Sequence, residues 1–405
     1  TITDWHSIDW KRAERQVGIL QKKVSNAYEA KQYRKAKRLQ YTLANSFYAK
    51  AVAVRTVTSN KGKNTPGVDG QKWNSPKQKF QALKSLNQGK YHAHPLRRVY
   101  IPKKSGKVRP LGIPTFFDRG MQKLYALTLE PVSELHADNY SYGFRKYRSA
   151  HDASRRLFNL LASKNGATWI IDADIKGCFD NISHEWILEH IPLPKTTLTK
   201  WLKCGLMDQN CFQETDKGTP QGGLISPMLA NYVLDGICEH IHQYLKIRLY
   251  AKRKKSAKIR VVRYADDIII SAAHREETPY ILKAVQNFLA LRGLETNNEK
   301  TKVISIEEGF DFLGWNYRKY KGKLLVKPSK SSVRELKRKI KDVFIRHLGS
   351  TQKVLIQHLN PIIRGWSNYH KHNVSKSTFT LLDTYIWQIT QRWGKRIHLN
   401  RWLRW

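Results

Sequence analysis

Aspartates on two separate segments are the residues of this chain best suited to do chemistry. The tetrapeptide Y-A-D-D at 264–267 lies between two apolar stretches, and Asp172 and Asp174 fall within another apolar stretch that begins at Ile170. Adjacent carboxylates repel each other unless a cation neutralises them. Their hard oxygens suit Mg²⁺, which keeps water and takes substrate phosphates as further ligands. Acids on two segments therefore predict a two-metal centre for phosphoryl transfer, with cations about 3.5–4 Å apart.

The sequence does not indicate a metal-binding role equally strongly for each of these acids. A Y-x-D-D tetrapeptide alone is a weak signal, because two acids in a β-turn are common, and the second acidic segment is what strengthens it. Strand alternation places Asp172 and Asp174 on the same face, so spacing does not choose between them. Asp180 is expected in the following turn or at the start of a helix.

The elements that must position these acids alternate between strands and helices from about 97 to 326, an α/β pattern. Buried strands are predicted at 170–175 and within 259–270, and a hairpin at 310–326 that turns near 321–322. A helix is expected to open at Ser226-Pro227, with the serine as N-cap and the proline in the first turn.

The flanks of this region are predicted to be helical. Residues 11–57 form helices, and 58–70 a loop rich in turn formers. After Pro328 the chain becomes all helix, opening with a capping box between Ser332 and Glu335. An apolar stripe then faces the core at Val333, Leu336, Ile340 and Phe344.

The charge balance points to nucleic acid. Lys and Arg number 73 against 32 Asp and Glu, a formal net charge of +41, which calls for a polyanionic partner. The excess is concentrated at 11–57 (twelve basic, two acidic residues), at 246–263 (nine and none) and at 321–405 (nineteen and three). We expect these surfaces to contact RNA phosphates. In the stretch at 11–57, the candidate RNA-binding residues are Lys22, Lys23, Arg34, Lys35, Lys37 and Arg38.

Other partners and sites are disfavoured. No apolar run reaches the roughly 18–20 residues needed to span a bilayer, so no membrane is expected. The four cysteines show neither C-x-x-C pairs nor histidines at zinc spacing, which favours reduced thiols.

Six motifs resemble those of reverse transcriptases and follow the family's order. D-I-K-G-C-F, which begins at Asp174, resembles motif A, and G-T-P-Q-G-G-L-I-S-P at 218–227 resembles motif B. Y-A-D-D resembles motif C, and N-E-K-T-K at 298–302 resembles motif D. The 98–114 segment resembles the fingers motif that holds the incoming triphosphate, and F-L-G-W at 312–315 the primer grip. This resemblance covers about 65–326. It implies a right-hand polymerase of mixed α+β class, with fingers and palm followed by an all-helical thumb.

Three further segments resemble the enzymes encoded within group II introns: T-P-G-V-D-G at 65–70, the 116–142 stretch followed by G-F-R, and R-G-W-S-N-Y-H at 364–370. This resemblance implies a basic helical, RNA-binding extension at 1–64, fingers and palm at 65–326, and a thumb or maturase domain at 327–405. Relatives often carry a DNA-binding segment and an H-N-H endonuclease after the thumb. Because the sequence ends at Trp405, we expect a thumb-terminated or truncated protein.

The resemblance also implies residue roles. Asp174 and Asp266 would ligate two Mg²⁺ ions, Asp267 would assist, and Ile175 would contribute its backbone carbonyl. Phe179 resembles the steric gate that excludes a 2′-hydroxyl; the competing interpretation is a core aromatic. Further dNTP contacts are implied at Lys104, Lys107, Arg109, Gln221, Gly222 and Lys300, of which the last could instead be a solvated surface lysine. The implied primer grip is Phe312, Leu313, Gly314 and Trp315.

The function implied is an RNA-directed DNA polymerase that extends a DNA primer on an RNA template with dNTPs. It would also bind group II intron RNA to assist splicing and retrohoming into target DNA. It would act as a ribonucleoprotein in the bacterial cytoplasm or in an organelle. The alternative is an RNA-binding splicing cofactor whose polymerase activity is secondary. An RNA replicase is disfavoured by Y-A-D-D in place of G-D-D, and by Phe179.

Overall fold

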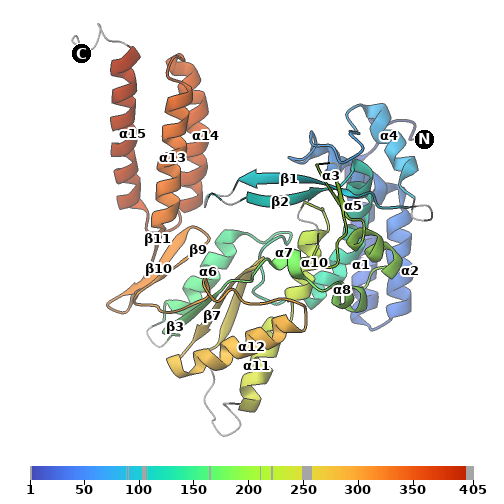
Figure 1. Cartoon of the computed structure of the whole chain (residues 1–405), viewed down its shortest axis with the longest axis horizontal. Coiled ribbons are helices and arrows are strands. Elements are labelled where there is room, and N and C mark those ends of the chain that lie inside the picture. Colours follow the sequence, from blue (N-terminus) through green and yellow to red (C-terminus); the bar gives the residue numbers. More distant parts are fainter. Residues whose placement is uncertain are drawn as a thin grey trace.

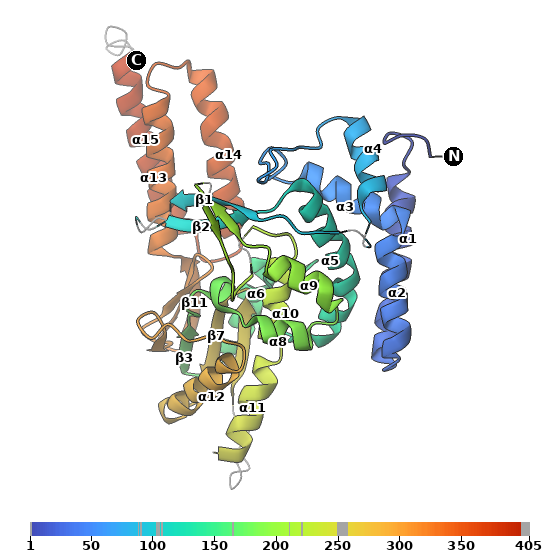
Figure 2. The ribbon, with the colours of Figure 1, turned by 45° about the vertical axis from the view of Figure 1, so that its right-hand side comes forward.

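The computed structural model describes residues 2–87, 89, 91–102, 106, 108–163, 166–209, 211–219, 222–248 and 258–397. The N-terminal helices lie on one side and three long C-terminal helices on the other, and a long β-hairpin extends from the first group toward the second (Figure 1). A four-stranded sheet with its helices lies below and between them, and a rotated view keeps this arrangement (Figure 2). The expected mixed α+β class, with an all-helical region after the sheets, is confirmed.

The N-terminal layer consists of α1 (Trp10–Glu29), α2 (Tyr33–Asn45) and α3 (Phe47–Ser59), as expected for 11–57. Asp9 caps α1 by accepting a hydrogen bond from the backbone of Arg12. All three helices pack on α5 (Phe116–His136), most of whose residues are buried. Small buried side chains on α3, including Ala49 and Ala53, allow close approach to α5. The helix α4 (Pro76–Ser85) packs against α3.

The fingers sheet has the order β2-β1-β4-β5. The antiparallel hairpin of β1 (Leu96–Pro102) and β2 (Val108–Ile113) contains most of the 98–114 motif, and Ile101 pairs with Arg109 near its tip. The short strands β4 (Leu206–Asp208) and β5 (Cys211–Gln213) extend the sheet, with β4 parallel to β1.

The palm sheet has the order β6-β7-β3-β8. Its strands are β3 (Trp169–Ala173), β6 (Arg260–Tyr264), β7 (Asp267–Ala272) and β8 (Lys302–Ser305), all antiparallel to their neighbours. Successive side chains point to opposite faces, and both faces are covered. Ile171 and Ile270 enter the larger core with α5, whereas Ile170 and Ile269 pack in a second core with α6 (Ala150–Leu161). This double coverage explains the continuous apolar runs around the acids.

Shorter helices surround the palm: α7 (Cys178–Asn181), α8 (His184–His190), α9 (Lys195–Leu202), α10 (Ser226–Leu234), α11 (Ile237–Arg248), η1 (Arg275–Glu277) and α12 (Thr278–Ala290). The predicted start of α10 is confirmed, with proline in its first turn, but the predicted cap is wrong. Ile225 occupies the N-cap position, and Ser226 is already helical and buried. Its hydroxyl therefore lies inside the first turn, where it makes no capping hydrogen bond.

A three-stranded sheet joins the palm to the thumb. Its strands are β9 (Phe310–Phe312), β10 (Trp315–Tyr320) and β11 (Lys323–Pro328), so the predicted hairpin turns at 321–322 as expected. The thumb helices are α13 (Lys330–Arg346), α14 (Gln352–His370) and α15 (Lys376–Ile397). The predicted apolar stripe on α13 does pack in the thumb core.

The predicted capping box of α13 is wrong. Ser329 is the N-cap, and its hydroxyl accepts a hydrogen bond from the backbone nitrogen of Ser332. The helix begins three residues earlier than expected, because a serine directly after Pro328 can cap it. Ser332 instead binds two groups of α14: Trp366 Nε1 lies 3.0 Å and His370 Nε2 3.1 Å from its Oγ.

Candidate active site

The two acidic segments meet at one end of the palm sheet. β6 and β7 pair Tyr264 with Asp267, so the two residues between them form a tight turn. Beside it, β3 ends at Ala173, which pairs with Ile268. One pocket of about 360 Å³ is lined by Asp172, Asp174, Asp267, Glu299, Lys300, Lys302, Asp311, Phe312 and Leu313. We call it the acidic pocket. Asp266 lies in the adjoining turn and is exposed to solvent.

The acidic pocket concentrates negative charge. Desolvation, together with the negative charges of Asp266, Asp172 and Asp174, raises the pKa of Asp267 to about 6. Burial also raises the pKa of Asp172 to about 6; Lys302 opposes this shift and Asp174 adds to it. The carboxylates thus repel one another, as their positions in the sequence predicted.

Asp174 is held in place by the motif at 298–302. Its backbone nitrogen donates to Thr301 Oγ1 at 3.3 Å, and its carbonyl accepts from the Asn297 nitrogen at 2.8 Å. Lys300 Nζ lies 3.4 Å from Asp174 Oδ2, with 67% and 32% of the two side chains exposed. An ion pair this exposed contributes little stability, so Lys300 is free to exchange Asp174 for another anion. Within the described ranges, no three acids, histidines or cysteines already converge as a metal-binding group.

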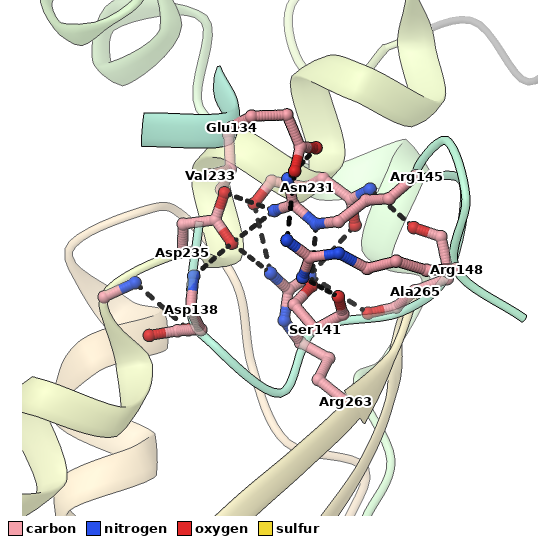
Figure 3. A network of polar contacts seen from close by, with 12 residues as sticks. Glu134, Asp138, Ser141, Arg145, Arg148, Asn231, Val233, Asp235, Arg263 and Ala265 are labelled. Carbon is pink, nitrogen blue, oxygen red and sulfur yellow. Dashed lines mark hydrogen bonds and ion pairs between the residues drawn. The ribbon is translucent and has the colours of Figure 1, made fainter. Parts of the chain in front are cut away.

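A buried network of ion pairs and hydrogen bonds supports the Y-A-D-D turn (Figure 3). Arg263, 1% exposed, donates to Asn231 Oδ1 at 3.0 Å and to the carbonyl of Ala265 in the turn at 3.3 Å. It also pairs with Asp235, which accepts two further bonds of 2.7 Å from Arg145. The turn is therefore tied to α10 and to the segment after α5.

This network corrects one expectation and adds residues that the sequence reasoning missed. Arg263 was counted in the basic RNA-contacting stretch at 246–263, but it is buried and paired with Asp235. Residues 249–257 of that stretch lie outside the described residues. A signal was present: an arginine inside an otherwise apolar strand must find a buried acid. Spacing could not name Asp235 as that acid, nor Arg145 as the second arginine that shares it.

Gly143 and Ala265 make the closest backbone contact at the turn. Ala265 adopts φ +57°, in the left-handed region that costs a residue with a Cβ roughly 1–2 kcal/mol. A Cβ on Gly143 would lie 2.3 Å from the Ala265 nitrogen. Asn231 Nδ2 donates to the Gly143 carbonyl at 2.8 Å and fixes that backbone. Glycine at this position therefore lets the 142–145 segment pack against the Y-A-D-D turn.

Phe179 lies on α7, as the last residue of motif A. Its ring is half-buried and packs against the larger core, and its carbonyl accepts from Thr219 at 2.6 Å. A Cβ on Gly218 would lie 2.6 Å from the Asp180 carbonyl. Motifs A and B are thus in backbone contact, and Asp180 lies in α7 as expected.

The residues predicted to bind the triphosphate are only partly brought together. Gly222, with φ +126°, approaches β2 so closely that a Cβ would lie 2.6 Å from the Gly112 carbonyl. Arg109 is exposed near the tip of the fingers hairpin and does not line the acidic pocket. Lys104, Lys107 and Gln221 lie outside the described residues.

The primer-grip motif divides into a pocket wall and an anchor. Phe312 and Leu313 line the acidic pocket, and Leu313 and Gly314 turn the chain with φ of +51° and +84°. Trp315 is buried and stacks on Tyr369 of α14, with ring centroids 4.4 Å apart. Tyr369 also donates its hydroxyl proton to the Leu313 carbonyl at 2.8 Å. The R-G-W-S-N-Y-H motif of the thumb thus fixes this turn.

The six candidate RNA-binding residues lie on α1 and α2, and all are exposed. Across the ranges that the structure describes, none of them is held in an ion pair, so their charge is available to a partner. Separately, none of the described helices has the length and apolar character needed to cross a bilayer.

Comparison with known proteins agrees with this geometry. The model of the reverse transcriptase (RNA-dependent DNA polymerase) family matches 101–317, that of the N-terminal domain of reverse transcriptase 5–86, and that of the group II intron maturase-specific domain 333–405. Protein YkfC of Escherichia coli is 35% identical over 306 residues, covering 65% of this chain and 78% of that protein.

Group II intron-encoded protein LtrA of Lactococcus lactis is 28% identical over 420 residues, covering 86% of this chain and 69% of that protein. Among solved structures, telomerase from Candida albicans has a TM-score of 0.44 at 13% identity, covering 76% of this chain and 59% of that one. The chain belongs to the reverse transcriptase family of RNA-directed DNA polymerases. Within that family it is of the group II intron type, a polymerase that also carries the maturase domain. Reverse transcriptases generally use divalent metal ions.

Proposed function

We propose that the acidic pocket is the centre at which this reverse transcriptase extends a DNA primer on an RNA template. One arrangement carries the proposal: acids from two separate segments, Asp174 and Asp267, line the same pocket as Leu313 of the primer grip. A primer end held by the 312–315 turn would thereby lie beside the carboxylates.

The pocket suits two Mg²⁺ ions. Its donors are carboxylates that repel one another, and they leave coordination positions for water and phosphate, as Mg²⁺ prefers. Asp174 and Asp266 would hold both ions, with Asp267 assisting and the carbonyl of Ile175 as a further ligand. When bound, the ions would lower the pKa of the primer 3′-hydroxyl and stabilise the leaving pyrophosphate.

The surrounding side chains would bind the dNTP. Lys300, close to Asp174, is placed to donate to the triphosphate. Phe179 would exclude a 2′-hydroxyl, and Gly222 would allow the backbone near the nascent base pair. Arg109 would reach the triphosphate from the fingers hairpin together with Lys104 and Lys107, because a guanidinium binds phosphate bidentately. Gln221 would complete the contact beneath the base pair.

The remaining surfaces would serve the intron. We assign RNA binding to 1–64, fingers and palm to 65–326, and thumb and maturase functions to 327–405. Group II intron RNA would contact the unpaired cations of α1 and α2, with target DNA engaged during retrohoming. The chain would act as a ribonucleoprotein in the cytoplasm of a bacterium or in an organelle; its similarity to the intron-encoded protein LtrA of a bacterium supports the bacterial setting. The alternative, a splicing cofactor with secondary polymerase activity, is favoured by that same basic surface.

Primer extension with separate acid variants tests the assignment. Asp174→Ala and Asp266→Ala should each nearly abolish cDNA synthesis while leaving RNA binding intact, because each removes a metal ligand. Asp172→Ala is the matched control: it lines the same pocket but should act much more mildly. Near-normal extension by the Asp174 or Asp266 variant would contradict the proposed centre. An equal loss in Asp172→Ala would mean that the wrong one of the two acids at 172 and 174 was chosen.

Assays of the same purified proteins also distinguish a polymerase from a splicing cofactor. The wild-type chain should extend a primer on RNA with dNTPs and much less with rNTPs. Splicing support without any extension would favour the cofactor, and preferential use of rNTPs would favour a replicase.

A further inference from the structure

A second cavity, of about 450 Å³, opens beside the N-terminal helices and shares no residue with the acidic pocket. It lies between α2, α5 and the segment between α8 and α9, on the side of the molecule opposite the thumb (Figures 1 and 2). Its volume is within the range of small-ligand sites. The lining residues are Tyr28, Tyr33, Ala36, Lys37, Gln40, Tyr41, Ala44, Tyr125, Thr128, Pro192, Leu193 and Pro194. We call it the tyrosine cavity.

The hollow follows from the residue spacing on α2. Ala36 and Ala44 are eight residues apart, with Gln40 midway, and residues four apart lie on one helix face. The two alanines are buried but too small to fill the space against α5. Gln40 bridges it instead, donating from Nε2 to the Thr128 carbonyl at 3.1 Å and the Pro192 carbonyl at 3.4 Å. The cavity is therefore held open by contacts to two other elements.

A second row on α2 forms the mouth of the cavity. Tyr33, Lys37 and Tyr41 recur at the same spacing, with a rise of about 6 Å per step. Tyr33 is 56% and Tyr41 66% exposed, so neither ring is needed to fill the core. Lys37 is exposed between them and, like its basic neighbours on α2, has no ion-pair partner in the described part of the chain. The mouth therefore alternates ring, cation and ring.

We propose that the tyrosine cavity binds unpaired nucleobases of the RNA whose phosphates contact the basic face of α1 and α2. Unstacked bases of loops and bulges are recognised by stacking on aromatic side chains. Tyr33 and Tyr41 supply the ring faces, and Lys37 neutralises the phosphate between successive bases. A paired helix presents no free base to the cavity. The proposal rests on the RNA-binding role assigned above to the N-terminal extension, and adds that this surface distinguishes unpaired from paired RNA.

Two RNA probes test it with the full chain: a stem-loop with a three-nucleotide bulge that carries 5-iodouridine, and the same stem fully paired. A double variant that carries Tyr33→Leu and Tyr41→Leu lacks both rings, and it should bind the bulged RNA about tenfold or more weakly than wild type. The salt dependence should stay unchanged, since no cation is lost. Ultraviolet light should crosslink the bulged RNA to the peptide at 32–41 in wild type, and not in this variant.

Matched controls separate the rings from other effects. Phenylalanine at both positions keeps the stacking faces and should retain wild-type affinity, whereas Tyr280→Leu removes a comparably exposed tyrosine on α12 and should change nothing. Equal losses for bulged and paired RNA, no loss, or crosslinks confined to other peptides would overturn the proposal. So would a leucine variant that changes the sedimentation of the RNA-free protein, since the cavity would then bind a second copy.

A third variant distinguishes this failure from failure of the RNA-binding surface itself. Neutralising Lys22, Lys23, Arg34, Lys35, Lys37 and Arg38 together should weaken binding of both probes and flatten the salt dependence. If it does so while the leucine variant is normal, the basic surface binds RNA and the tyrosine cavity does not. If the folded charge variant binds both probes normally, the basic surface is solely solubilising, and the cavity proposal falls with it.

Discussion

Replacing the carboxylate of Asp235 gives the sharpest test of how the Y-A-D-D turn is held. Its side chain is 4% exposed and neutralises two buried guanidiniums, those of Arg145 and Arg263. In Asp235→Asn both cations lose their shared anion, and Arg145 retains its bond of 2.7 Å to Glu134. Removing one partner of a buried ion pair costs about 3–5 kcal/mol. Because two cations are affected, we expect the free energy of unfolding to fall by about 5 kcal/mol, the upper end of that range.

Arg263→Met should cost less, about 3 kcal/mol, because Asp235 remains doubly bonded to Arg145. Urea denaturation followed by circular dichroism measures both values. Glu14→Gln makes the same kind of carboxylate-to-amide change in the exposed pair with Arg55, and should cost at most about 1 kcal/mol. A smaller loss in Asp235→Asn than in Arg263→Met, or losses no larger than in Glu14→Gln, would refute the view that one buried anion organises this site.

Three further outcomes follow from the geometry. Gly143→Ala should abolish primer extension, because its Cβ would lie 2.3 Å from the Ala265 nitrogen; a normal extension rate would show that the turn can move. Phe179→Val should raise the ratio of ribonucleotide to deoxyribonucleotide incorporation, and an unchanged ratio would leave Phe179 as a core aromatic. Burial, with a smaller effect of His151, lowers the pKa of His370 to about 4, so protonation as pH falls from 6.5 toward 4 removes about 3 kcal/mol of stability. His370→Asn should lessen this acid loss in thermal melts, and an equal loss would exclude His370 as its source.

The sequence predicts best the features that are local or that repeat along one element. The strands around the acids, the α13 stripe and the hairpin at 321–322 each follow from apolar spacing or turn residues within a short window, and each is confirmed. Helix caps were less certain, because Ser329 and Ser332 offer the same hydroxyl three residues apart. The choice depends on α14, whose Trp366 takes up the Ser332 hydroxyl.

The support of the site could not be derived in this way. Arg263 and Arg145 are 118 positions apart, and Asp235 joins them through tertiary contacts that no local pattern encodes. Arg263 was also counted in the basic stretch at 246–263, because a count of charged residues does not distinguish a buried cation from an exposed one. The tyrosine cavity is similar, since Gln40 on α2 bridges to carbonyls 88 and 152 positions away.

The stack of Trp315 on Tyr369 has a mechanical consequence. Tyr369 belongs to α14 of the thumb, and its hydroxyl donates a hydrogen bond to the carbonyl of Leu313, which lines the acidic pocket. A swing of α14 about this joint must either break that bond or shift the pocket wall with it. The position of α14 and the shape of the acidic pocket are therefore mechanically coupled through the Tyr369 hydroxyl and the Leu313 carbonyl.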